Sequence, residues 1–140
     1  MDEIIMNRIL SIVLLANMAW AVNASADDPK TLPTCMVYID HGAWVYRYQE
    51  WTLEIVPTPC GRNVGAEETA YTFFEIAKKF SGSEHWGNTR GMINQLTCHY
   101  AIARNKPEWN LDPWRPYVGH AATVEASCNV TVPKPDTPFE

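Results

Sequence analysis

The apolar and polar residues between positions 43 and 56 alternate with a period of two. The apolar side chains that share a face are Trp44, Tyr46 and Tyr48 in the first half, and Trp51, Leu53 and Ile55 in the second. This pattern predicts a two-stranded hairpin, because alternate side chains of a strand point to opposite faces. We expect the aromatic face to join the core, with an exposed platform for stacking a ligand as the alternative. The apolar run 36–40 predicts a further strand.

Two later segments have apolar residues at helical spacing. Residues 66–80 predict an amphipathic helix on the sheet, with an apolar face made of Ala66, Ala70, Phe73, Phe74, Ala77 and Phe80. Asn88 or Thr89 can cap a second helix that runs to about residue 105. Residues 106–117 contain three prolines and predict an irregular segment, whereas residues 119–128 fit either a helix or a strand. We therefore expect an α+β fold, with a small antiparallel sheet packed against two or three helices and stabilised by disulfides.

The N-terminal region predicts export. An apolar run from Ile9 to Val22 precedes Ala24-Ser25-Ala26, a small-residue site that signal peptidase accepts. The run is shorter than the roughly 18 apolar residues that span a membrane, so we expect cleavage near Ala26 and no stable membrane span. The protein would then be secreted or periplasmic, with translation starting at Met1 or Met6. We expect residues 27–34 to be a lead-in, 35–130 a single globular domain and 131–140 a disordered tail.

All four cysteines, Cys35, Cys60, Cys98 and Cys128, follow the predicted signal peptide and would meet an oxidising compartment. Three pairings are possible. Cys35 begins one strand-like run and Cys60 ends another, so an antiparallel arrangement favours Cys35–Cys60 and leaves Cys98–Cys128. Each bridge would stabilise the fold by about 3 to 4 kcal/mol. The alternative is a zinc site, but the chain has no C-x-x-C or H-x-x-x-H spacing, so we expect neither a metal nor another cofactor.

The charge balance argues against nucleic acid as a partner. The chain has 11 Lys and Arg against 16 Asp and Glu, a formal charge of −5. Without residues 1–26 the balance is 10 basic against 14 acidic residues, which gives −4. Such a surface gains nothing from releasing the counterions of DNA or RNA.

The candidate site residues begin with Gln95 and His99, which share a face of the second predicted helix. His99 titrates near neutrality and is a candidate acid or base, with Arg62 or Arg115 to hold an anion. His41, after Asp40 at a strand end, completes the candidate pocket. The structural alternatives are a half-buried His99 bonded to backbone, a surface His41, and an Arg115 that bridges the proline-rich loop to the helix.

A thiol protease built on Cys98 and His99 is rejected. Adjacent helical side chains point about 100° apart, and Cys98 is expected in a bridge.

Five stretches carry a family resemblance: YIDHGAWV, WTLEIVPTPCGR, NTRGMINQLTCHYAIA, KPEWNLDPWRP and Cys128-Asn129. They resemble the bacterial secreted family called domain of unknown function 2599 over about residues 37–129. Gln95-x-x-Cys98-His99 and the segment Trp109–Pro116 are the most specific parts. Many members lack counterparts of Cys35 and Cys60, so the resemblance implies that Cys98–Cys128 is the basic bridge. The chain departs from the family at Val130, where a proline commonly follows the Cys-Asn pair, and the resemblance implies no activity.

Two functions fit these observations. We favour a non-catalytic binding module whose aromatic residues stack on an envelope glycan, a lipid-linked molecule or a protein partner. The candidates for stacking are Trp44, Trp86, Trp109 and Trp114. The alternative is an extracytoplasmic hydrolase or toxin with a site around His99. The two differ in whether His41, Arg62, Gln95, His99 and Arg115 converge in one hollow.

Overall fold

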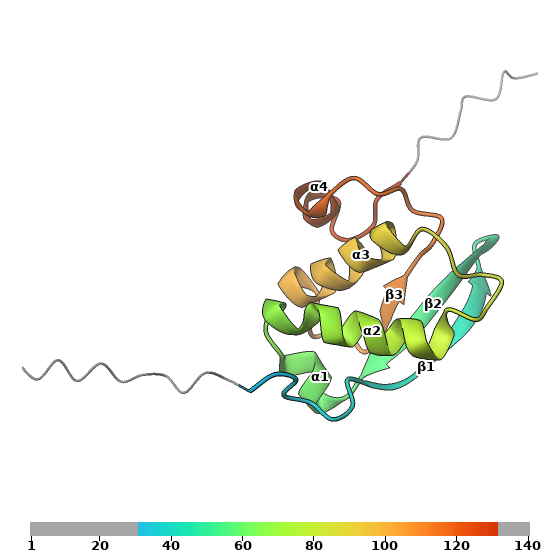
Figure 1. Cartoon of the computed structure of the whole chain (residues 1–140). Coiled ribbons are helices and arrows are strands. Elements are labelled where there is room, and N and C mark those ends of the chain that lie inside the picture. Colours follow the sequence, from blue (N-terminus) through green and yellow to red (C-terminus); the bar gives the residue numbers. More distant parts are fainter. Residues whose placement is uncertain (1–30, 132–140) are drawn as a thin grey trace, which may run out of the picture.

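Strands β1 (Ile39–Arg47) and β2 (Glu50–Pro57) form a hairpin, and β3 (Trp109–Leu111) pairs with the other edge of β2 (Figure 1). Both pairings are antiparallel. The computed structural model describes residues 31–131, so the predicted signal peptide, the first half of the lead-in and residues 132–140 of the predicted tail lie outside it. The predicted hairpin is confirmed, but its first strand already begins at Ile39 and includes the end of the apolar run expected as a separate strand.

The turn between β1 and β2 is formed by two residues that both have positive φ, Tyr48 at 52° and Gln49 at 66°. Two-residue hairpin turns of this kind match the twist of the strands, and they strongly favour Asn-Gly or Asp-Gly. A tyrosine and a glutamine adopt this backbone at a cost in conformational energy. The chain therefore keeps a large aromatic side chain at the end of the hairpin, where it is 93% exposed.

The helices are α1 (Pro59–Asn63), the short 3-10 helix η1 (Ala66–Glu68), α2 (Thr69–Phe80), α3 (Thr89–Ile102) and α4 (His120–Glu125). The predicted cap of α3 is confirmed, since the Asn88 side chain accepts a hydrogen bond from the backbone N–H of Gly91 at 3.1 Å. Helix α1 was not among the predicted elements: Thr58 caps it and Pro59 occupies its first turn. The α+β class is confirmed.

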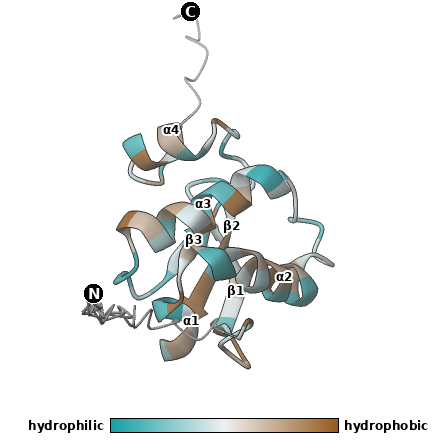
Figure 2. Ribbon diagram, turned by 60° about the vertical axis from the view of Figure 1, so that its left-hand side comes forward, coloured by the Kyte–Doolittle hydropathy of each residue, from teal (hydrophilic) through white to brown (hydrophobic). Residues whose placement is uncertain are grey.

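The core lies between the sheet and helices α2 and α3, and Figure 2 shows hydrophobic stretches of the sheet next to these helices. Its fully buried apolar residues are Ile39, Leu53, Ile55, Ile76, Met92, Leu96, Trp109 and Leu111. The expectation of a buried aromatic face was wrong for Tyr46 and Tyr48, which are 58% and 93% exposed. The helices cover only the base of the hairpin, so the face that is buried at Leu53 reaches solvent at Tyr46. Phe74, expected on the inner face of its helix, is exposed as well.

Two disulfides hold the ends of the fold. Cys35–Cys60 joins the segment before β1 to α1, and Cys98–Cys128 joins α3 to the segment after α4, with Cα–Cα distances of 5.8 and 5.7 Å. This is the pairing favoured from the antiparallel strands. Among residues 31–131 there is no helix whose length and apolar character suit a membrane span.

Candidate functional site

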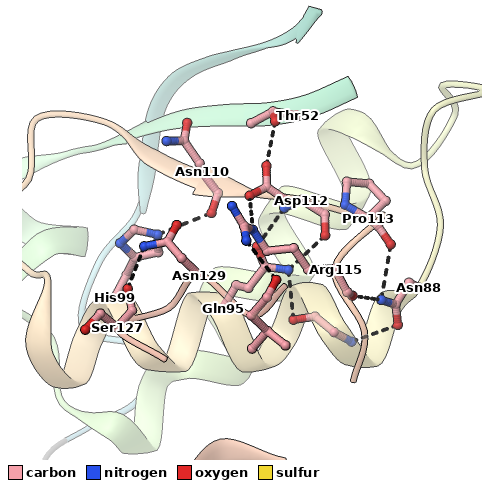
Figure 3. Close-up of polar contacts among 12 residues, drawn as sticks. Thr52, Asn88, Gln95, His99, Asn110, Asp112, Pro113, Arg115, Ser127 and Asn129 are labelled. Carbon is pink, nitrogen blue, oxygen red and sulfur yellow. Dashed lines mark hydrogen bonds and ion pairs between the residues drawn. The ribbon is translucent and has the colours of Figure 1, made fainter. Parts of the chain in front are cut away.

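Helix α3 and strand β3 are joined by two side chains that lie one helical turn apart. Gln95 binds the backbone of Asp112, and His99 binds the backbone of Asn110 (Figure 3). Four helical residues rise about 6 Å and two strand residues about 6.7 Å. The spacing of Gln95 and His99 therefore matches alternate residues of the strand. The shared face predicted from the sequence is real, and it fixes the position of β3 against the helix.

Gln95 holds Asp112 at two points. Its Oε1 accepts from the Asp112 backbone N–H at 2.8 Å, and its Nε2 donates to the Asp112 carbonyl at 2.9 Å. The side chain is only 2% exposed, so these bonds form away from water. The amide thus satisfies two buried backbone groups that have no strand partner at the end of the sheet.

The carboxylate of Asp112 connects three segments of the chain. One oxygen accepts from the Thr52 hydroxyl on β2, and the other accepts from Nε of Arg115, both at 2.5 Å. Nη1 of Arg115 continues to the carbonyl of Val130 at 2.8 Å. Arg115 thus bridges the proline-rich loop to the segment after α4, whereas the structural alternative had expected a bridge to the helix, which its side-chain hydrogen bonds within residues 31–131 do not reach. Because both carboxylate oxygens accept hydrogen bonds, the Asp112 side chain is held in a fixed position.

His99 is neutral and packed. Its Nε2 lies 3.2 Å from the Asn110 carbonyl oxygen, and its ring stacks on Trp109 with 5.4 Å between centroids. A carbonyl oxygen only accepts, so Nε2 carries the proton and Nδ1 is left as an unprotonated nitrogen, buried with no partner among residues 31–131. Burial lowers the pKa of His99 from 6.5 to about 4. The imidazole is 4% exposed and is therefore placed for packing.

Three other predicted site residues take no part in the hydrogen bonds around Asp112. Trp109 is fully buried between the rings of His99 and Tyr100, so its indole offers no face to a ligand. Arg62 lies against Trp109, 5.5 Å from the ring centroid, and donates to three carbonyls in the loop after α3. His41 is exposed on β1 and contacts Asp40 at 2.7 Å. The five candidate residues therefore do not converge in one hollow.

A polar hollow of about 290 Å³ has the Asp112–Arg115 pair in its lining. It is lined by Arg47, Tyr48, Thr52, Asn110, Asp112, Trp114, Arg115 and Asn129. Of the sequence candidates it contains Arg115 and Trp114. Asn110 and Asp112 lie within the most specific motif and could have been found there, whereas nothing in the sequence marked Arg47 or Thr52.

The donors in this hollow come from two arginines. The guanidinium of Arg115 lies 4.2 Å from the Trp114 ring centroid, and no described residue accepts from its Nη2. Arg47 has one contact, from Nη1 to Glu54 at 3.3 Å. Asn129 donates through Nδ2 to the Ser127 carbonyl, so its amide oxygen remains available as an acceptor. The hollow offers donors, an acceptor and the open side of an indole to one small ligand.

Three hollows of larger volume have a different character. One of about 640 Å³ follows the end of α3 and residues 103–107. Two others, of about 510 and 580 Å³, flank α2 and are lined largely by apolar side chains. These three do not gather polar side chains from distant segments as the 290 Å³ hollow does. Within the described part of the chain, no group of three or more His, Cys, Asp or Glu side chains could hold a metal ion.

Comparison with known proteins identifies relatives without an assigned role. The family described as "Protein of unknown function (DUF2599)" matches residues 39–131. Uncharacterized protein Rv0477 of Mycobacterium tuberculosis and Uncharacterized protein Mb0487 of Mycobacterium bovis are each 26% identical over 106 residues. The matched region covers 73% of this chain and 72% of each relative. No solved structure matches the chain significantly.

Proposed function

The chain belongs to the DUF2599 family of proteins of unknown function, and we propose that it is an exported, non-catalytic binding domain. Its ligand site would be the hollow between the β1–β2 turn and the segments that follow β3 and α4. Two disulfides are compatible with an extracytoplasmic location. One observation carries the proposal: a guanidinium held by Asp112 and Val130 lines a polar hollow, and its Nη2 has no hydrogen-bond partner among the described residues.

Preorganisation favours binding in this hollow. Arg115 is fixed by hydrogen bonds through Nε and Nη1 and by the indole of Trp114, and Asp112 is fixed in turn by Gln95. A ligand that meets Nη2 would not need to order this side chain. A volume of about 290 Å³ lies at the lower end of ligand pockets and suits one sugar ring or a group of similar size. An envelope glycan is therefore the favoured partner, ahead of a lipid-linked molecule or a protein.

The residues in and near the hollow do not favour hydrolysis. Catalysis near neutral pH needs a base whose pKa lies near that pH and that a substrate can reach. The pKa of His99 is lowered to about 4 by burial, and its ring is 4% exposed. Asp112 already accepts hydrogen bonds at both oxygens, and the described residues that line the hollow include no His, Cys or Lys.

Saccharide titrations followed by NMR test this proposal. The probes are N-acetylglucosamine, glucose and glucuronic acid, added to the mature, oxidised protein. We expect the largest shifts at the indole N–H of Trp114 and at the amides of Thr52 and Asn129. Asn129→Ala should weaken binding several-fold, whereas His41→Ala on the exposed part of β1 should not. Shifts elsewhere on the surface, or equal binding by both variants, would overturn the assignment, as would hydrolysis of a glycoside that depends on His99.

A further inference from the structure

Two of the three charged side chains that line the hollow are cationic. Arg47 and Arg115 contribute two guanidinium groups, and Asp112 is the one carboxylate in the lining. Both oxygens of Asp112 are already bonded within the wall, to Thr52 and Arg115. Glu54 lies outside the lining and makes one 3.3 Å contact with Arg47. Each arginine thus has one carboxylate partner and keeps further N–H donors, and such charged donors bind a carboxylate better than a neutral hydroxyl.

A second observation points to a ring that bears hydroxyl groups. The guanidinium of Arg115 covers one face of the Trp114 indole, and the indole is still 36% exposed. Tyr48 borders the same hollow from the strained hairpin turn. Aromatic faces favour the apolar side of a sugar ring, and the free amide oxygen of Asn129 accepts from a hydroxyl. Arginine edges, an amide acceptor and two aromatic rings thus surround one small volume.

We propose that the hollow recognises an acidic saccharide, a sugar residue whose ring carries a carboxylate, with Arg115 and Arg47 on the carboxylate and Trp114 and Tyr48 beside the ring. The inference rests on the binding function proposed above and names its ligand class. Arg115 would orient the carboxylate of the saccharide, because Asp112 and Val130 hold its guanidinium in place. Arg47, which is half-exposed and held by one contact, supplies charge.

The test compares saccharides that share one ring and differ in the group at C6, which is charged in one of them and neutral in the other two. Affinities are measured by calorimetry at low salt for methyl β-D-glucuronoside, its methyl ester and methyl β-D-glucoside. We expect the glucuronoside to bind at least tenfold more tightly than the two neutral compounds, and we expect added salt to reduce this preference. Arg47→Gln should remove most of the preference for the glucuronoside over the two neutral compounds. Arg90→Gln, which alters an arginine stacked on Tyr117 outside the hollow, is the matched control.

The possible results separate this inference from the proposed function. Equal affinity for the glucuronoside and the glucoside would overturn the proposal of an acidic ligand and would indicate a site for neutral saccharides. Tighter binding of acetyl-Ala-Ala than of the glucuronoside would overturn it in favour of a peptide carboxylate. Binding of none of these probes, with no shift at Trp114, would overturn the binding function itself. Because Arg47 makes one partly exposed contact, the Arg47→Gln protein should fold, and its thermal unfolding checks this.

Discussion

Acidification should destabilise the protein through His99. Burial lowers the folded-state pKa of this imidazole to about 4, against about 6.5 in an unfolded chain. Below pH 6.5 protons bind the unfolded chain more readily, so stability falls as the pH drops toward 4 and the loss then levels off. At 1.36 kcal/mol per pH unit the full loss is about 3 kcal/mol. Between pH 7.5 and 5 it is about 2 kcal/mol, or about 10 °C in melting temperature for a domain of this size.

The charged groups near His99 do not reverse this direction. The positive charge of Lys106 lowers the pKa further, and the negative charge of Asp112 raises it by less than burial lowers it. Burial raises the pKa of Glu75, but hydrogen bonds from Lys79 and from the backbone of Tyr38 and Ile39 lower it overall, below 4.5. Stability from Glu75 is therefore lost only under more acidic conditions. Most of the His99 contribution therefore falls between pH 7.5 and 5, above the range in which Glu75 contributes.

The assay is urea denaturation of wild type, His99→Gln and His41→Gln at pH 7.5 and 5. Glutamine does not titrate, and it keeps a donor for the Asn110 carbonyl. It lacks the ring that stacks on Trp109, so His99→Gln should be less stable at pH 7.5 by about 1 to 3 kcal/mol. On acidification, the free energy of unfolding of His99→Gln should fall by about 2 kcal/mol less than that of wild type. His41→Gln keeps the buried His99 imidazole, so it should still lose about 2 kcal/mol on acidification and serves as the control. Parallel losses in wild type and His99→Gln would refute the reasoning.

Three further changes test other parts of the structure. Gln95→Leu should lower the free energy of unfolding by about 1 to 3 kcal/mol, measured in urea, because the buried Asp112 N–H loses its partner and the Asp112 carbonyl keeps only the Arg115 N–H; a loss below 1 kcal/mol would contradict the two-point contact. Replacing Tyr48-Gln49 by Asn-Gly should raise the melting temperature by a few degrees, because those residues suit positive φ; an unchanged or lower value would show that the turn is not strained. Replacing Cys98 and Cys128 by alanine should cost about 3 to 4 kcal/mol by loop entropy, and an unchanged urea midpoint would argue against that bridge.

The elements that the sequence predicted well are those with strong local signals. The hairpin has a clear period of two, and α3 begins at a capping asparagine, Asn88. The segment that contains the strand Trp109–Leu111 was expected to be irregular because it lies between prolines, and the strand itself is only three residues long. It is a strand because β2 and α3 hold it, which no local pattern encodes. Helix α1 did have a signal, a threonine cap followed by proline, but its five residues resembled a turn.

The candidate site was predicted in part. The spacing of Gln95 and His99 correctly placed both on one face, but periodicity does not reveal whether that face meets solvent or a strand. Arg115 was found because it lies between a tryptophan and a proline. Asp112, its partner, was not selected, because a carboxylate three residues earlier in a loop is a common turn residue. The opposite wall of the hollow comes from the hairpin, about 60 residues earlier, and only the folded chain brings the two walls together.

The connectivity of the two disulfides affects how the protein can mature. Each cysteine pairs with the next one along the chain, at separations of 25 and 30 residues, so the two closed loops follow one another without overlapping. In a chain that emerges N-terminus first into an oxidising compartment, Cys35 and Cys60 are both available before Cys98 has crossed. The earliest possible pairing is then already the native one. An oxidase that joins cysteines in order of appearance is sufficient for maturation, and disulfide shuffling is not required.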